Sequence, residues 1–112
     1  MADPRLRQLT IKTGVVKRLT KEKSVCEKEV VTEQKRLERF KGEGADEHVL
    51  NKQQEVISEC FMMLPDTLRR LKKELEALEK FLLDEEELKE TKEYETALQV
   101  VNDAKEVLAK TD

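Results

Sequence analysis

The sequence predicts an all-α protein, an elongated antiparallel bundle of three helices that is similar to a coiled-coil rod. Charged residues make up 42% of the 112 residues and aromatic residues 4%, a composition typical of helical bundles. Apolar residues recur every three or four positions, as on one face of a helix. The breaks in this pattern are short, and short connections make neighbouring helices antiparallel. We expect a single domain, residues 1–112, with helices at about 4–41, 47–82 and 85–109.

The first predicted helix begins at Asp3-Pro4, because Asp is a good N-cap and Pro is favoured at the first helical position. Two glycines in the segment KGEGAD, residues 41–46, supply the positive φ angles that end a helix. Asp46 is the expected N-cap of the next helix. Two series spaced by seven form a heptad seam with several polar members: Leu9, Val16, Lys23, Val30 and Leu37, interleaved with Lys12, Leu19, Cys26, Glu33 and Phe40.

The second predicted helix contains a proline, Pro65, in the middle of a regular seam. A proline inside a helix removes a hydrogen bond and clashes with the carbonyl four residues earlier, so it marks either a junction of two helices or a kink in one. The spacing by seven continues past Pro65, and we therefore predict one helix that is kinked there. We interpret the kink as shaping a partner-binding face; a merely tolerated kink is the alternative. The two series are Leu50, Ile57, Leu64, Leu71 and Leu78, and Gln54, Phe61, Leu68, Leu75 and Leu82.

The third predicted helix starts after Asp84, because Asp84 and Glu87 have the spacing of a capping box. Leu83 and Leu88 have the spacing of a hydrophobic staple. Because this helix is the shortest, residues 31–56 should form a two-helix hairpin without a third partner. The expected inner face consists of Tyr94, Ala97, Leu98, Val101, Ala104 and Leu108.

No pattern in the sequence indicates an enzyme, a cofactor or a metal site. A Gly-rich phosphate loop, zinc-ligand spacing, a GxSxG motif and EF-hand spacing are all missing. No segment approaches the ~20 apolar residues that cross a bilayer, and the first residues hold no apolar secretion signal. Cys26 and Cys60 are therefore expected to be buried free thiols in a reducing compartment. The antiparallel register places the two cysteines at the same level along the first and second helices.

Charge is distributed unevenly along the chain. Residues 1–23 hold seven Lys and Arg against two acidic residues, and residues 84–95 hold seven acidic residues against two Lys. We expect these segments to compensate one another across neighbouring helices; a two-signed surface for a charged protein partner is the alternative. The balanced charge and missing stacking aromatics argue against nucleic acid. The basic start also resembles a mitochondrial presequence, but it contains Asp3-Pro4 and runs directly into the heptads.

Three segments resemble one known family. MADPRLRQLTIKTGVVKRLTKEK at the start, FMMLPDTLRRL at residues 61–71 and EYETA from Glu93 are similar to tubulin-specific chaperone A, also called tubulin folding cofactor A. The rest of the chain resembles the family in helix pattern and length, while KGEGAD and the last residues depart from it. The resemblance implies a cytoplasmic, cytoskeleton-associated chaperone that captures β-tubulin folding intermediates after their release from the cytosolic chaperonin. It would hold them for the other tubulin-folding cofactors that assemble the αβ heterodimer, without nucleotide hydrolysis or metal.

Candidate protein-binding residues follow from expected exposure beside the seams, where each is equally compatible with an ordinary solvated surface. An alternative function is a structural coiled-coil adaptor that acts through helix–helix association. A capture protein should be a monomer or a weak dimer, whereas an adaptor should form tight oligomers. The candidates are Lys17, Arg18 and Lys21 on the first helix, and Arg69, Arg70, Lys72 and Lys73 on the second.

Overall fold

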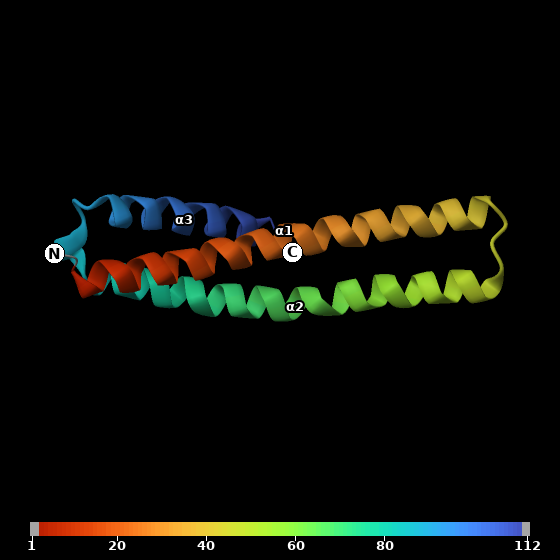
Figure 1. The fold of residues 1–112 in the computed structure, drawn as a ribbon, viewed down its shortest axis with the longest axis horizontal. Helices are drawn as coiled ribbons and strands as arrows, with labels where there is room; N and C mark the ends of the chain where they lie inside the picture. The colour runs from red at the N-terminus through yellow and green to blue at the C-terminus, as the bar shows by residue number, and fades with distance from the viewer. Residues whose placement is uncertain (1–2, 111–112) are drawn as a thin grey trace. The chain divides into compact units, whose positions relative to one another are not determined.

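The computed structural model describes residues 3–110 and confirms an all-α protein with three α-helices (Figure 1). Helix α1 spans Pro4–Gly42, α2 spans Glu47–Asp84, and α3 spans Lys92–Ala109, with a short 3-10 helix, η1, at Glu86–Leu88. The chain divides into two compact units. Unit 1 comprises Met1–Lys21 and Leu68–Asp112, and unit 2 comprises Glu22–Thr67. Helices α1 and α2 therefore contribute to both units, whereas α3 belongs to unit 1.

The predicted starts of the first two helices, and the end of the first, are confirmed in their hydrogen bonds. The Asp3 carboxylate accepts from the Arg5 backbone N–H at 2.9 Å, and the Asp46 carboxylate accepts from the Val49 N–H at 3.0 Å. Both aspartates thus act as N-caps. At the end of α1, Gly44 has a φ of 73°. The N–H groups of Gly44 and Ala45 donate to carbonyls of the last helical turn, the pattern of a glycine-terminated helix.

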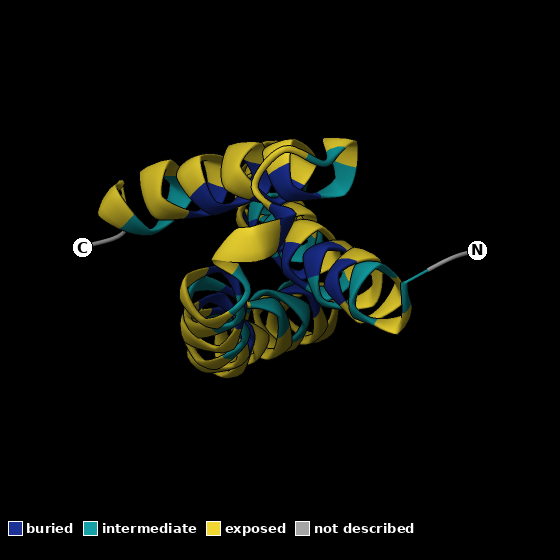
Figure 2. Cartoon of the chain, turned by 90° about the vertical axis from the view of Figure 1, so that its left-hand side faces the viewer, coloured by how far each residue is buried: buried dark blue, intermediate teal, exposed yellow. Residues whose placement is uncertain are grey.

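Unit 1 is a complete three-helix bundle whose helices turn their buried residues inward (Figure 2). Ala97 and Ala104 on α3 are 0% exposed, and these small side chains let α3 pack closely. The Tyr94 hydroxyl donates to the Leu82 carbonyl at 2.9 Å and joins α3 to the end of α2. The core consists of Leu9, Val16, Leu19, Leu71, Leu75, Leu78, Leu82, Leu88, Tyr94, Ala97, Val100, Val101 and Ala104.

Unit 2 consists of segments of α1 and α2, and its core is small and partly polar. Cys26 and Val30 are its buried apolar residues, and Lys23, Gln53 and Thr67 are buried beside them. The Gln53 amide donates to the Glu33 carbonyl at 2.9 Å and to the Glu33 carboxylate at 2.7 Å, and thereby links α2 to α1. A pair of helices that buries so little apolar surface is only weakly stabilised by its own core.

The predicted start of the third helix is wrong. Helix α2 continues through Asp84, and the Glu85 N–H donates to the Phe81 carbonyl at 2.9 Å. Asp84 is therefore still helical and cannot act as an N-cap, which requires an extended backbone. Thr91 has that conformation, with φ −83° and ψ 155°, and its hydroxyl accepts from the Tyr94 N–H. The prediction that Leu83 and Leu88 form a hydrophobic staple is also wrong, because Leu83 is 74% exposed while Leu88 is buried.

Helix α2 is continuous through Pro65, as the one-helix prediction required. The seam does shift, however, which the strict spacing by seven did not anticipate. Gln54 and Phe61 are exposed, and Gln53 and Cys60 point inward in their place. The inward-facing residues Gln53, Cys60 and Thr67 are spaced by seven, and so are Leu75 and Leu82. Thr67 and Leu75, however, are eight residues apart. Such a step accommodates the drift of roughly 20° per heptad between a straight helix and a strict seven-residue repeat.

One inner-face residue of α3 was also misassigned. Leu98 is 45% exposed, whereas Val100 is 8% exposed and belongs to the core. Tyr94, Ala97, Val101 and Ala104 are buried as predicted, and Leu108 is half-buried.

Candidate protein-binding surfaces

Within residues 3–110 there is no group of His, Cys, Asp and Glu side chains that could bind a metal ion. None of the described helices is long and apolar enough to cross a membrane. The hollows in the surface are open, and a typical one has a volume of about 340 Å³. The exposed faces of the helices carry the features described below.

The seven predicted basic residues are all exposed and all belong to unit 1. Lys17, Arg18 and Lys21 lie on α1. The other four candidates lie on α2: Arg69, Arg70, Lys72 and Lys73. The candidates are thus contributed by two helices of the same unit. Their exposure follows the prediction made from the seams, and their role in partner binding stays a prediction.

A cluster of exposed apolar side chains lies on α2, just before Pro65. Phe61 is 57% exposed, Met62 73% and Met63 60%. Cys60 and Leu64 on either side are half-buried, so apolar side chains surround the helix at this level. Helices that are apolar all round are normally covered. Sequence reasoning missed the exposure of Phe61 because it placed this residue in the seam, although five consecutive apolar residues, 60–64, were a visible signal.

A second exposed feature is one side of the two-helix pair in unit 2, which we call the open face. A hollow of about 340 Å³ is lined by Gln34, Leu37 and Glu38 of α1 and by Gln54 and Ile57 of α2. Closer to the start of α1, Val31 is 49% exposed and lines another open hollow with Glu27. Phe61 follows Gln54 by seven residues and therefore shares its side of α2. The open face comprises Glu27, Val31, Gln34, Leu37, Glu38, Gln54, Ile57 and Phe61.

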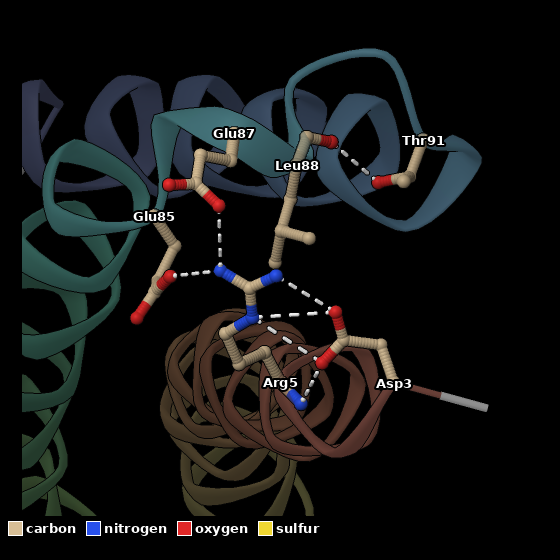
Figure 3. Close-up of polar contacts among 6 residues, drawn as sticks. All are labelled: Asp3, Arg5, Glu85, Glu87, Leu88 and Thr91. Atoms are coloured by element: carbon tan, nitrogen blue, oxygen red, sulfur yellow. Dashed lines mark hydrogen bonds and ion pairs between the residues drawn. The ribbon is translucent and has the colours of Figure 1, made fainter.

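Arg5 forms an ion-pair cluster at the end of unit 1 (Figure 3). Its guanidinium donates to Asp3 at 2.8 Å, to Glu85 at 2.8 Å and to Glu87 at 3.2 Å. Hydrogen bonds to Asp3, and then to Glu85 and Glu87, raise the pKa of Arg5, and Arg5 in turn lowers the pKa of Asp3. The basic start of the chain and the acidic segment after α2 are thus paired here, as the compensation hypothesis predicted. These charges are therefore paired with one another inside unit 1.

Both cysteines lie in unit 2 and both are free thiols. Cys26 is buried as expected, while Cys60 is half-buried. Burial raises the pKa of the Cys26 thiol, with further contributions from Glu29, Glu22 and Cys60. The electrostatic effect of Cys60 on Cys26 agrees with the antiparallel register, which placed the two at the same height. A buried thiol with a raised pKa is a weak nucleophile.

Comparisons with known proteins identify the family. The sequence profile described as "Tubulin binding cofactor A" matches residues 4–101. The chain is 46% identical to "Tubulin-specific chaperone A" of Gallus gallus over 105 residues, which cover 94% of this chain and 97% of that protein. Solved structures agree. The human tubulin chaperone cofactor A has a TM-score of 0.78 at 39% identity and covers 91% of this chain and 99% of its own. The Arabidopsis thaliana tubulin folding cofactor A has a TM-score of 0.82 at 38% identity, with 92% and 97% covered. The chain belongs to the tubulin binding cofactor A family.

Proposed function

We propose that this protein captures β-tubulin folding intermediates and holds them for assembly into the αβ-tubulin heterodimer. It acts by binding, without catalysis or a cofactor, in the cytoplasm and in association with the cytoskeleton. The other tubulin-folding cofactors receive the bound β-tubulin from this protein. The observation that carries the proposal is the family match over nearly the whole chain, to relatives that are named tubulin-specific chaperones.

The exposed side chains support a binding role of this kind. A folding intermediate presents apolar segments that the native protein would bury, and these need an apolar surface to rest on. Phe61, Met62 and Met63 offer such a surface. Methionine is flexible and polarisable, so it adapts to irregular partners. The basic groups on α1 and α2 would add electrostatic steering of an oppositely charged partner.

A structural coiled-coil adaptor remains the second candidate function, because exposed apolar residues on α2 are also suited to helix–helix association. Met63 is 60% exposed. The two candidates predict different oligomeric states, since a capture protein would be a monomer or a weak dimer. Sedimentation velocity over a wide concentration range separates them: a tight oligomer at low concentration favours the adaptor.

A chaperonin-coupled folding reaction tests the proposed function directly. Labelled β-tubulin and α-tubulin are released separately from the cytosolic chaperonin in the presence of this protein carrying an affinity tag. We expect β-tubulin to be retained on the tagged protein, and α-tubulin to pass through. Replacing Lys17, Arg18 and Lys21 together by Gln should slow capture, most at low ionic strength. Absence of a β-tubulin complex under conditions in which α-tubulin folds normally would overturn the proposal.

A further inference from the structure

We propose that the open face of unit 2 binds an amphipathic helix of the captured tubulin chain, which takes the position of a third helix. This inference rests on the proposed function and names the surface that performs it. In unit 1, α3 fills the corresponding role and contributes a strip of buried residues that includes Tyr94, Ala97 and Val101. Unit 2 contains the same two long helices and lacks a third.

The heptad positions of α1 show which side of the helix is left uncovered. In unit 1, Thr10 and Thr13 line a hollow together with Lys92, Glu93 and Thr96 of α3, so they lie on the side of α1 that faces α3. Val31 and Glu38 follow Thr10 by three and four heptads, and Gln34 follows Thr13 by three. Residues a whole number of heptads apart share one side of a helix in a bundle. The side of α1 that borders α3 in unit 1 is therefore exposed in unit 2.

The α1 seam keeps its phase over this distance, which the comparison of heptad positions requires. Leu9, Val16, Lys23 and Val30 are spaced by seven and are all buried. The one-residue shift described above occurs on α2. On that helix the open face is defined directly, because Gln54 and Ile57 line the same hollow as the α1 residues.

The open face has the composition of a groove that receives a helix. Val31 is 49% exposed and Phe61 57% exposed, and Leu37 and Ile57 on the same face are half-buried. These four apolar side chains, contributed by two antiparallel helices, suit the apolar stripe of an amphipathic helix with anchors at i, i+3 or i+4, and i+7. A partly folded tubulin chain would supply such a stripe before its own core closes.

The net charge of unit 2 indicates which charges the partner helix should carry. Unit 2 contains seven Lys and Arg and eleven Asp and Glu, a net charge of −4. On and beside the open face, Glu27 and Glu38 each form an ion pair within α1, with Lys23 and Lys41, and Lys28 is also basic. The preference for a partner therefore rests on the net negative charge of unit 2, which favours a helix whose apolar stripe is flanked by Lys or Arg. The same charge disfavours a second copy of this chain, because a symmetric contact would bring two acidic surfaces together.

Two matched double variants test the inference. V31Q/F61Q removes the exposed apolar side chains of the open face. V25Q/V49Q removes exposed apolar side chains from other sides of the same helices, since Val25 is 43% exposed and Val49 39% exposed. Val25 is rotated about 120° from Val31, and Val49 about 120° from Phe61, at 3.6 residues per turn. All four positions are exposed, so both proteins should fold with near-wild-type circular dichroism.

The probe is labelled β-tubulin released from the chaperonin, as in the test of the proposed function. We expect V31Q/F61Q to reduce the retained β-tubulin about tenfold or more, and V25Q/V49Q to retain it at nearly the wild-type level. The inference is overturned if the two variants behave alike, or if V25Q/V49Q suffers the larger loss. It is also overturned if V31Q/F61Q abolishes self-association in sedimentation while β-tubulin is still retained. Failure of the wild-type protein to retain β-tubulin contradicts the proposed function itself.

Discussion

Two buried polar side chains join neighbouring helices. Tyr94 connects α3 to the Leu82 carbonyl in unit 1, and Gln53 connects α2 to Glu33 in unit 2. Such groups must keep their partners, because an unpaired polar atom in a protein interior costs more than the hydrogen bond contributes. Arg5 meets three carboxylates in a partly exposed position. Exposed ion pairs contribute little to stability, so we expect Arg5 to order the end of unit 1 without strongly stabilising it.

Replacing Tyr94 by Phe should destabilise the protein by about 1 kcal/mol, because it removes the hydroxyl and leaves the buried Leu82 carbonyl without this donor. The ring itself stays in place and the core remains filled. Thermal unfolding followed by circular dichroism measures the change. R5Q serves as the comparison and should lower the melting temperature less than Y94F. A larger effect of R5Q would show that the surface cluster stabilises unit 1 more than the buried hydrogen bond does.

The two thiols should differ in their reactivity. Burial raises the pKa of Cys26, so a smaller fraction of this thiol is deprotonated at neutral pH, and the thiolate is the species that reacts. We expect iodoacetamide at pH 7 to modify Cys60 first and Cys26 slowly, with the rate at Cys26 rising as the pH is increased. Mass spectrometry of peptides from timed samples measures both rates. Equal rates in the folded protein would contradict the burial of Cys26; equal rates in urea are expected.

At the scale of the helices, the sequence predicted the ends that depend on local chemistry. Asp3 and Asp46 cap α1 and α2 because a short carboxylate at this position accepts hydrogen bonds from the first backbone N–H groups of the helix. The start of α3 could not be read in the same way. Asp84 matched a capping spacing, but continued hydrogen bonding of α2 kept it helical, and Thr91 became the cap. That choice depends on tertiary packing around the buried Leu88, which no local pattern reveals.

The candidate site was predicted less well than the fold, for a related reason. The seven basic residues were correctly expected to be exposed, since they lie beside the seams. The open face was anticipated in part, because a short third helix implied an uncovered hairpin. The exposure of Phe61 was missed, because a strict seven-residue count cannot reveal a one-residue shift between Thr67 and Leu75. Such a shift is set by how the two helices pack.

Pro65 interrupts the hydrogen bonds of α2 beside the exposed cluster Phe61–Met63. Proline lacks the N–H that would otherwise donate to the Phe61 carbonyl. The substitution Pro65→Ala restores this donor, and we expect it to raise the stability of the protein by about 1 kcal/mol or more. If the local irregularity serves capture, the variant should also retain less β-tubulin. Thermal unfolding and the chaperonin-coupled assay, run on the same sample, measure both effects.

A Pro65→Ala variant that becomes more stable and retains β-tubulin fully would show that the proline is tolerated and has no role in binding. A variant that loses stability would show instead that the packing around α2 requires the proline geometry.

At the scale of the whole molecule, the core is distributed unequally between the two units. Of the fifteen apolar residues described as buried, thirteen belong to unit 1, and Cys26 and Val30 belong to unit 2. Unit 1 therefore has the apolar core that stabilises a fold. Unit 2 leaves much of its apolar surface exposed. In our account the first unit supplies stability and the second supplies a surface that a partner completes.

This division predicts a gradient of local stability in the free protein. Amide protons of residues 31–56 should exchange fastest among the helical segments, because few apolar contacts cover them. Amides around Leu71 and Val101, in the core of unit 1, should exchange slowest. Native-state hydrogen exchange with mass spectrometry resolves these segments. Equal protection in the two sets would mean that unit 2 is stabilised by contacts other than its small core.

Hydrogen exchange on the complex tests the central claim, that unit 2 is the surface completed by the tubulin chain. The protein is bound to β-tubulin released from the chaperonin, and its exchange is compared with that of the free protein. We predict that protection increases most at residues 27–38 of α1 and 54–61 of α2, while α3 changes little. A gain in protection confined to unit 1, with residues 27–38 and 54–61 exchanging as fast as in the free protein, would contradict the account.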